Sequence, residues 1–152
     1  MAETPDPMRL ALDQARAAAA RGEVPVGAVI VRDGAVLAEA GNETLARDDP
    51  TAHAEMLVIR AAAAASGSQR LAGADLYVTL EPCPMCAAAI SFARIRRLYF
   101  GAADQKGGAV ENGVRLFGQP TCHHAPAVYG GIGESEAVAL LRGFFSARRV
   151  VG

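Results

Sequence analysis

Apolar side chains recur every three to four positions in four segments of the chain, a period typical of helices that bury one face. The first segment is rich in alanine and ends at Gly22. The second follows Thr51, a residue type that often caps the start of a helix. The pattern predicts helices over Pro7 to Arg21, about Ala52 to Ala65, Cys83 to Phe92 and Ser135 to Arg149.

Short apolar runs with β-branched and aromatic residues lie between these helices. Two of the runs flank Asp33-Gly34, which is typical of a tight hairpin turn, so they should pair as antiparallel neighbours. Strands that alternate with helices on a mixed sheet predict an α/β fold with three layers, α/β/α. The predicted strands are Gly27 to Arg32, Val36 to Gly41, Leu76 to Leu80, Leu98 to Gly101 and Ala127 to Ile132.

The composition favours one globular domain over residues 1–152, because 51% hydrophobic residues suffice for one core and the length is short for two. The first residues lack the pattern of a secretory signal, and no apolar run reaches the roughly 20 residues of a membrane span. We therefore expect a cytoplasmic protein without a membrane segment. The net charge of −1 gives no global basic field for nucleic acid, although arginine clusters still bind phosphate locally.

Cys83 and Cys86 form a Cys-x-x-Cys pair in a chain with three cysteines. Such a pair can be half of a structural zinc site, a redox dithiol or part of a catalytic metal site. A lasting disulfide is disfavoured in a reducing compartment, so the pair should bind metal or act in redox chemistry. Cys122 is expected to be a free thiol.

A third metal ligand is available in His53, which opens the second predicted helix together with Glu55. Two helix starts that face one another could bring one imidazole and two thiolates to one metal ion. Three protein ligands leave a fourth position for water, as in catalytic rather than structural zinc sites. Glu55 could then move a proton between water and a leaving nitrogen.

Each part of this pattern also has an ordinary explanation. Cys-x-x-Cys after a strand is found in thioredoxin-like redox proteins, and Glu55 could simply complement the dipole of its helix. In combination, His53-Ala-Glu55 followed by Pro82-Cys83-x-x-Cys86 matches the H-x-E and P-C-x-x-C signature of zinc-dependent nucleobase deaminases.

Several longer segments resemble the bacterial tRNA-specific adenosine deaminases, nearly along the whole chain and in the same order. The resemblance implies a cytidine-deaminase-like fold with a five-stranded sheet and helices on both faces, one zinc ion per subunit, and a homodimer. It also implies conversion of the wobble adenosine of an arginine tRNA anticodon to inosine. The segments are VPVGAVIV (24–31), DPTAHAEM (49–56), LYVTLEPCPMCAAAI (76–90), FGAADQKGGA (100–109) and LLRGFFSARR (140–149).

The resemblance assigns roles to residues around the zinc ligands. It implies that Asn42 hydrogen-bonds the extruded base, with Val26 and His53 in the wall of the pocket. The backbone N–H groups of Ala54 and Cys83 would orient groups at the metal.

The resemblance also implies a surface for RNA. Asp104 and Lys106 would contact the anticodon loop of the tRNA stem-loop, and Phe144 or Phe145 with Arg148 would support flanking nucleotides. Phe144 and Phe145 are adjacent on a helix, so at least one of them should belong to the core.

Two alternatives to the tRNA enzyme remain open. The zinc signature is shared by deaminases of free bases and nucleotides, and Pro84 is common in those that act on guanine, so a guanine or cytosine deaminase is the first alternative. A zinc-dependent RNA-binding module without catalysis is the second. The presence of all three ligands together with Glu55 disfavours it.

Overall fold

The structure is a computed structural model that describes residues 6–151, and it contains the predicted elements in the predicted order. The helices are α1 (Pro7–Ala20), α2 (Ala54–Ser66), α3 (Pro84–Phe92) and α4 (Glu134–Val151), with a short 3-10 helix at Leu116–Gly118. The strands are β1 (Gly27–Arg32), β2 (Ala35–Gly41), β3 (Asp75–Leu80), β4 (Arg97–Ala102) and β5 (Ala127–Tyr129).

The five strands form one mixed sheet in the order β2-β1-β3-β4-β5. Strand β1 pairs antiparallel with both β2 and β3, whereas β3, β4 and β5 run parallel. The predicted hairpin joins β1 and β2, and both of its central residues have positive φ, 52° at Asp33 and 77° at Gly34. Positive φ at both positions is the requirement of the type I′ turn that matches strand twist.

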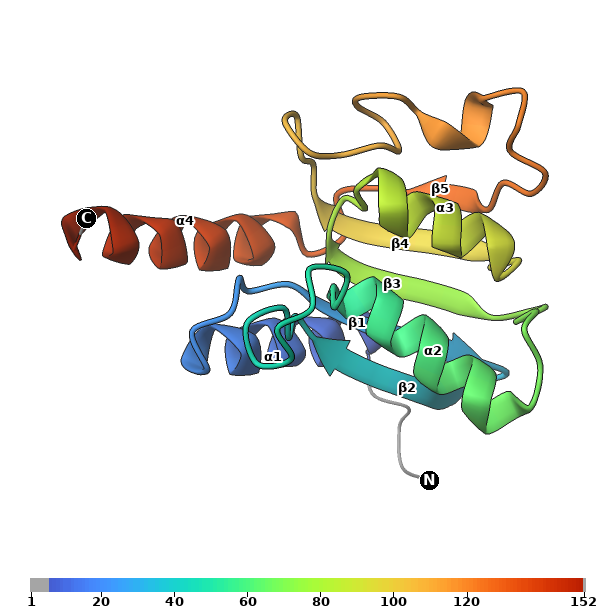
Figure 1. Cartoon of the computed structure of the whole chain (residues 1–152), viewed down its shortest axis with the longest axis horizontal. Coiled ribbons are helices and arrows are strands. Elements are labelled where there is room, and N and C mark those ends of the chain that lie inside the picture. The colour runs from blue at the N-terminus through green and yellow to red at the C-terminus, as the bar shows by residue number, and fades with distance from the viewer. Residues whose placement is uncertain (1–5, 152) are drawn as a thin grey trace.

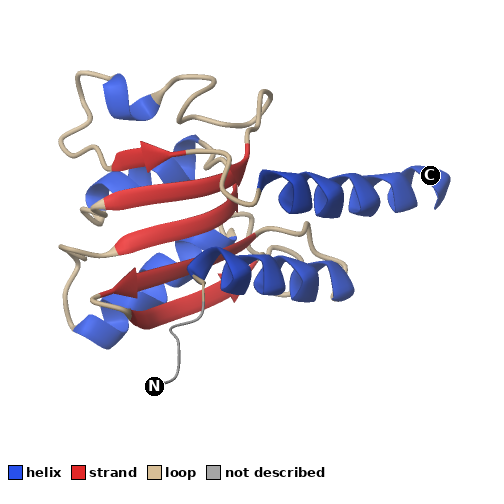
Figure 2. Cartoon of the chain, turned by 180° about the vertical axis from the view of Figure 1, so that it is seen from behind, coloured by secondary structure: helices blue, strands red, loops and turns tan. Residues whose placement is uncertain are grey.

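Helices cover both faces of the sheet, which confirms the predicted three layers (Figures 1 and 2). On one face, Val58 of α2 and Ile90 of α3 pack in a cluster with β-strand residues such as Leu76. On the other face, Leu12 of α1 and Ala137 of α4 belong to a second cluster. The C-terminal part of α4 extends beyond the sheet, as both views show.

The structure corrects the predicted start of the second helix. Thr51 does not cap it, because its hydroxyl is 2.7 Å from Oδ1 of Asp49 and its backbone N–H donates to the same carboxylate. The N-cap is His53, whose backbone is extended (φ −71°, ψ 151°), and α2 begins at Ala54. Similarly, Cys83 is the N-cap of α3 and lies just outside the helix.

The last strand is also shorter than predicted. It ends at Tyr129 because the chain turns at Gly131, which has a φ of 81°. In the part of the chain that the structure describes, no helix combines the length and the apolar character needed to span a membrane.

Candidate active site

The side chains of His53, Cys83 and Cys86 meet at one point between the start of α2 and the start of α3. The Nδ1 atom of His53 is 3.7 Å from Sγ of Cys83 and 3.5 Å from Sγ of Cys86. All three ligand atoms lie within 4.8 Å of one another. Cys83 and Cys86 lie at the start of α3, shortly after the end of β3. The backbone at His53 is extended, and its imidazole lies beside them. The structure thus brings together residues that are 30 positions apart in the sequence.

The spacing of these donors fits a zinc ion. With Zn–S of about 2.3 Å and Zn–N of about 2.0 Å, tetrahedral angles separate a sulfur and a nitrogen ligand by roughly 3.5 Å. The two observed sulfur–nitrogen distances, 3.7 and 3.5 Å, agree with this value. Two thiolates and one imidazole are also a donor set that zinc prefers. The cluster therefore has the geometry and chemistry of a three-ligand zinc site.

The charge states of the three ligands are linked by their proximity. A hydrogen bond from Cys86 lowers the pKa of Cys83 to about 4, and the contact with Cys83 raises the pKa of His53. The same hydrogen bond to Cys83, together with burial, raises the pKa of the Cys86 thiol. A coordinated cation would deprotonate both thiols, because the charge of the metal outweighs these hydrogen bonds and the effect of burial.

Glu55 lies in the first turn of α2 beside the ligands and is 4% exposed. Burial raises the pKa of its carboxyl group to about 7. A group with this pKa can both accept and donate a proton near neutral pH, which is the property required of an acid-base catalyst. The position of Glu55 therefore fits the predicted role in proton transfer.

Asn42 directly follows β2, is 9% exposed, and accepts a hydrogen bond at Oδ1 from the N–H of Ala54, 2.9 Å away. The Ala54 N–H is thus engaged by Asn42, and its predicted role in orienting groups at the metal stays a prediction. Within the described residues, the amide nitrogen of Asn42 has no hydrogen-bond partner. Asn42 thus orients the start of α2 and keeps a donor for a ligand.

Val26, which directly precedes β1, supports the same corner of the site. Its carbonyl accepts a hydrogen bond from the N–H of Asn42, and its side chain is 4% exposed in the core. The predicted place of Val26 in the pocket wall stays a prediction, as does the role of the Cys83 N–H.

Comparison with known proteins identifies the family. The family described as the cytidine and deoxycytidylate deaminase zinc-binding region matches residues 1–102. The chain is 65% identical to the tRNA-specific adenosine deaminase of Agrobacterium fabrum, over 99% of each chain. It is 44% identical to the tRNA-specific adenosine deaminase of Bacillus subtilis, over 91% of this chain and 86% of that one.

The chain belongs to the tRNA-specific adenosine deaminases. It superposes with a TM-score of 0.88 on a structure from a study of A-to-I editing by tRNA:A34 deaminases at the wobble position. That match has 67% sequence identity and covers 89% of this chain and 98% of the other. A guanine deaminase from Bacillus subtilis is more distant, with a TM-score of 0.64 and 31% identity over 92% of each chain. The family and the three-donor cluster together confirm the prediction of a zinc-dependent deaminase.

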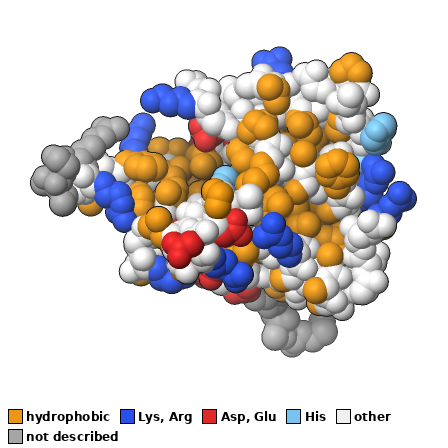
Figure 3. All heavy atoms as spheres, viewed as in Figure 1, with side chains coloured by type: hydrophobic (Ala, Val, Ile, Leu, Met, Phe, Trp, Pro, Cys, Tyr) orange, Lys and Arg blue, Asp and Glu red, His pale blue; other side chains and the backbone are white. Residues whose placement is uncertain are grey.

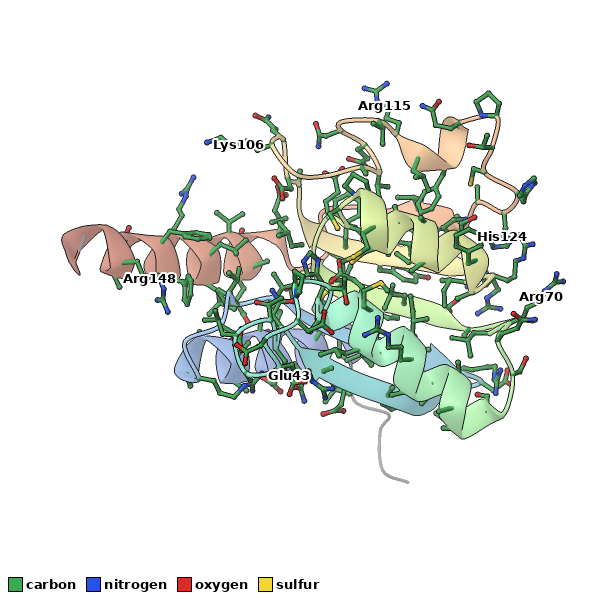
Figure 4. The ribbon with its side chains drawn as sticks, viewed as in Figure 1. Glu43, Arg70, Lys106, Arg115, His124 and Arg148 are labelled. Carbon is green, nitrogen blue, oxygen red and sulfur yellow. The ribbon has the colours of Figure 1, made fainter. Side chains whose placement is uncertain are left out.

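The loop after β4 carries two of the predicted RNA contacts of this deaminase. Oδ1 of Asp104 accepts hydrogen bonds from the backbone N–H groups of Lys106 and Gly107, at 3.1 and 2.9 Å. The carboxylate therefore shapes the turn on which Lys106 is exposed. Figure 4 shows the Lys106 side chain pointing away from the loop into solvent.

The two adjacent phenylalanines of α4 have different surroundings. Phe144 is 9% exposed, which confirms that at least one of the pair is core, whereas Phe145 is 44% exposed. Phe145 lines a hollow of about 180 Å³ with Leu141, Arg142 and Ser146. Figure 3 shows hydrophobic side chains gathered beside α4, with basic side chains around them.

Arg148 is engaged within the protein. Its guanidinium lies 3.3 Å from the ring centre of Phe144 and donates to the carbonyl of Gly22, 3.0 Å away. Figure 4 accordingly shows Arg148 on the side of α4 that faces α1. A contact with RNA would require this side chain to leave or share its present partners. The side chain of Arg149 lies outside the described residues.

Two buried carboxylates, Glu23 and Glu81, were not among the predicted site residues. Both bind mainly backbone N–H groups of loops near the site. Their only sequence signal is an acidic residue inside an apolar context, as in Gly22-Glu23-Val24. Such a residue must find donors if it is buried, but the sequence does not name them.

Proposed function

We propose that the protein hydrolytically deaminates the wobble adenosine of a tRNA anticodon at a zinc ion held by His53, Cys83 and Cys86, and that the products are inosine and ammonia. The observation that carries this proposal is the buried Glu55 beside the three-donor zinc site, in a chain 65% identical to a tRNA-specific adenosine deaminase. The similarity to tRNA-specific adenosine deaminases indicates the substrate, and the geometry of the site indicates the chemistry. A tRNA substrate would place the reaction in the cytoplasm.

The reaction needs one water and two proton transfers. Zinc held by the three donors would supply a Lewis acid that lowers the pKa of water. The Glu55 carboxylate accepts a proton from the water that attacks C6 of adenine, and it returns a proton to the exocyclic amino group. The C6–N bond then breaks and ammonia leaves. Burial of Glu55 supports both transfers because it keeps the pKa of the carboxyl group near 7.

Binding of the base is assigned to the corner formed by Asn42 and Val26. The Asn42 oxygen is held by the Ala54 N–H, so its amide NH₂ is fixed in direction and can donate to an acceptor on the base. Lys106 on the loop after β4 and Phe145 on α4 are exposed and can receive the flanking nucleotides, by charge and by stacking. Asp104 acts by shaping the turn that carries Lys106.

An assay of inosine formation tests the function. An anticodon stem-loop of an arginine tRNA with a wobble adenosine should yield inosine, measured by mass spectrometry of the digested RNA. Free adenosine, adenine, cytosine and guanine should release no ammonia at the same enzyme concentration. Rapid ammonia release from guanine or cytosine, without inosine in the stem-loop, would favour the free-base alternative. A stem-loop with another anticodon sequence tests the preference for arginine tRNA.

A Glu55→Gln variant separates chemistry from binding in the same assay. We expect turnover to fall by roughly 10² to 10⁴-fold, the usual contribution of an acid-base group, because the amide cannot accept the proton. Zinc content and stem-loop affinity should stay at the level of the unmodified protein. Turnover within a few-fold of that level would remove Glu55 from the mechanism.

We also propose that the protein is a homodimer that uses the face around Phe92. The Phe92 side chain is 76% exposed at the end of α3, next to a cavity of about 300 Å³ lined by residues such as Ala88 and Leu116. In a two-fold dimer each Phe92 could enter the cavity of the other copy. Light scattering should give twice the mass of 15.7 kDa, and Phe92→Ser should shift the population to monomers. A monomer at micromolar concentration would contradict the proposal.

A further inference from the structure

Glu81 is a buried acidic residue that the proposed reaction does not use. It follows β3 directly and is 2% exposed. Its Oε1 accepts from the N–H of Asp104 at 3.0 Å and from Nδ2 of Asn112 at 2.7 Å. Its Oε2 accepts from the backbone N–H groups of Val110, Glu111 and Asn112, at 3.1, 3.0 and 3.0 Å.

These donors determine the charge of Glu81. All five groups that hydrogen-bond the two Glu81 oxygens are N–H donors, so both oxygens act as acceptors, as those of an ionised carboxylate do. Glu81 is therefore a carboxylate that binds both ends of one loop, residues 104–112. Hydrogen bonds to an ionised acceptor are stronger than neutral ones, so this one side chain restrains the loop strongly.

The loop is joined to the zinc-binding segment at a second point. The N–H of Ala109 donates to the carbonyl of Pro82, 2.9 Å away, and Pro82 immediately precedes Cys83. The loop that exposes Lys106 is thus fixed to the same few residues that carry the metal ligand Cys83. Any displacement of the loop would change the distance between Lys106 and the reaction centre.

Gly108 gives independent support for this close attachment. A Cβ atom at Gly108 would lie 2.5 Å from Oε2 of Glu81 and 2.5 Å from the carbonyl oxygen of Asp104, closer than real Cβ atoms approach such groups. The Glu81 side chain cannot move aside without losing its hydrogen bonds. The loop therefore requires glycine here, because its backbone passes directly over the carboxylate.

We propose that Glu81 is a positioning residue for RNA binding: it holds the loop from Asp104 to Asn112 in the one conformation that presents Lys106 to the anticodon. This inference rests on the proposed function, since it assumes that the loop contacts RNA. A loop that is ordered before binding loses less conformational entropy in the complex. Glu81 should consequently affect the affinity for RNA much more than the chemical step.

A Glu81→Gln variant tests the proposal. Glutamine keeps the size of the side chain, but it removes the charge and turns an NH₂ group toward backbone N–H groups. We expect amide hydrogen exchange in residues 104–112 to accelerate at least tenfold, and KM for the stem-loop to rise roughly 10 to 100-fold, the range for one or two charged hydrogen bonds. The kcat should stay within threefold, and zinc content should not change. Glu111→Gln is the matched control, because it removes an exposed carboxylate from the same loop and should leave all four measurements unchanged.

A Gly108→Ala variant disturbs the same contact without a change of charge. It should raise KM with little change in kcat, and the double variant should show less than the sum of the two single effects, because both act on one contact. If the unmodified protein forms inosine and both variants keep its KM, Glu81 serves stability alone and the proposal is wrong. Loss of zinc or a fall in kcat at constant KM would also overturn it. An unmodified protein that makes no inosine refutes the proposed function instead, which is a distinct outcome.

Discussion

At the scale of single residues, the three cysteines of the chain differ only in their neighbours. Cys86 is buried and lies 3.5 Å from the His53 nitrogen. Cys122 lies elsewhere, where its thiol donates to the carbonyl of His124 at 3.1 Å and contacts the Ser91 hydroxyl at 3.5 Å. The same functional group thus belongs to a three-donor cluster that fits zinc at one position and is a simple hydrogen-bond donor at the other.

Replacement of these two cysteines tests the metal site. Cys86→Ser should lower the bound zinc well below one ion per subunit and reduce activity in parallel, because a neutral hydroxyl is a poor zinc ligand. Cys122→Ser is the matched control and should keep both zinc and activity. Elemental analysis of the purified proteins provides the measurement. Full zinc content in Cys86→Ser would remove this residue from the ligand set.

At the scale of elements, the site depends on how closely α1 approaches the sheet. Gly27 begins β1 next to α1, and a Cβ atom there would overlap with the carbonyl oxygen of Ala11. It would also lie 2.6 Å from the backbone nitrogen of Ala15. Val26 directly precedes Gly27, and its carbonyl accepts a hydrogen bond from the N–H of Asn42. The contact between α1 and β1 therefore determines the position of Asn42 in the site.

Alanine substitutions at two glycines test this contact. Gly27→Ala should destabilise the fold by about 1–3 kcal/mol, because α1 must move away from β1. Gly143→Ala, within α4, should instead stabilise it by about 0.5–1 kcal/mol, because alanine favours the helix and, among the described residues, no atom beyond its own helical backbone and chain neighbours lies within 4 Å of the added Cβ. Urea unfolding at one fixed zinc concentration measures both, since bound metal adds to stability. Equal effects of the two substitutions would contradict the close approach.

At the scale of the whole molecule, buried carboxylates link distant parts of the chain. Glu23, between α1 and β1, is 1% exposed and accepts hydrogen bonds from the N–H groups of Leu45 and Ala46, at 3.0 and 2.9 Å. Burial opposes its ionisation, but these bonds outweigh it and hold the pKa of Glu23 below its ordinary value. Glu23 thereby fixes the loop that leads from Asn42 to His53.

The lowered pKa of Glu23 predicts a pH-dependent contribution to stability. A carboxyl group with a lower pKa in the folded state than in the unfolded state stabilises the fold above the unfolded pKa of about 4.3. The contribution is lost as the pH falls through the folded value. Glu23→Gln should therefore cost about 1–3 kcal/mol at pH 7, and the difference from the unmodified protein should shrink below about pH 4.3.

Urea unfolding of both proteins between pH 7 and pH 3.5 measures this difference, and losses common to both cancel. Glu39→Gln, on the edge strand β2, is a suitable control because its carboxylate is exposed. Its curve should follow that of the unmodified protein at every pH. A difference for Glu23→Gln that stays constant on acidification would show that its charge does not stabilise the fold.

The sequence alone determined the elements and the chemistry of this protein. Alternating and helical apolar patterns defined the strands and helices, because one face of each must be buried. The residue types at His53, Glu55, Cys83 and Cys86 defined a three-ligand zinc site with a proton carrier, because only a few side chains bind zinc. The longer motifs then defined the substrate class through the family.

Only the tertiary structure decided how these parts are oriented. It selected His53 over Thr51 as the N-cap of α2, because Asn42, which follows β2, binds the Ala54 N–H. It buried Phe144 and exposed Phe145, since a helix can turn only one of two adjacent residues toward the core. The tertiary structure also decided which loops Glu23 and Glu81 bind. Their partners are backbone N–H groups, which every residue except proline carries, so no pattern of side chains marks them in the sequence.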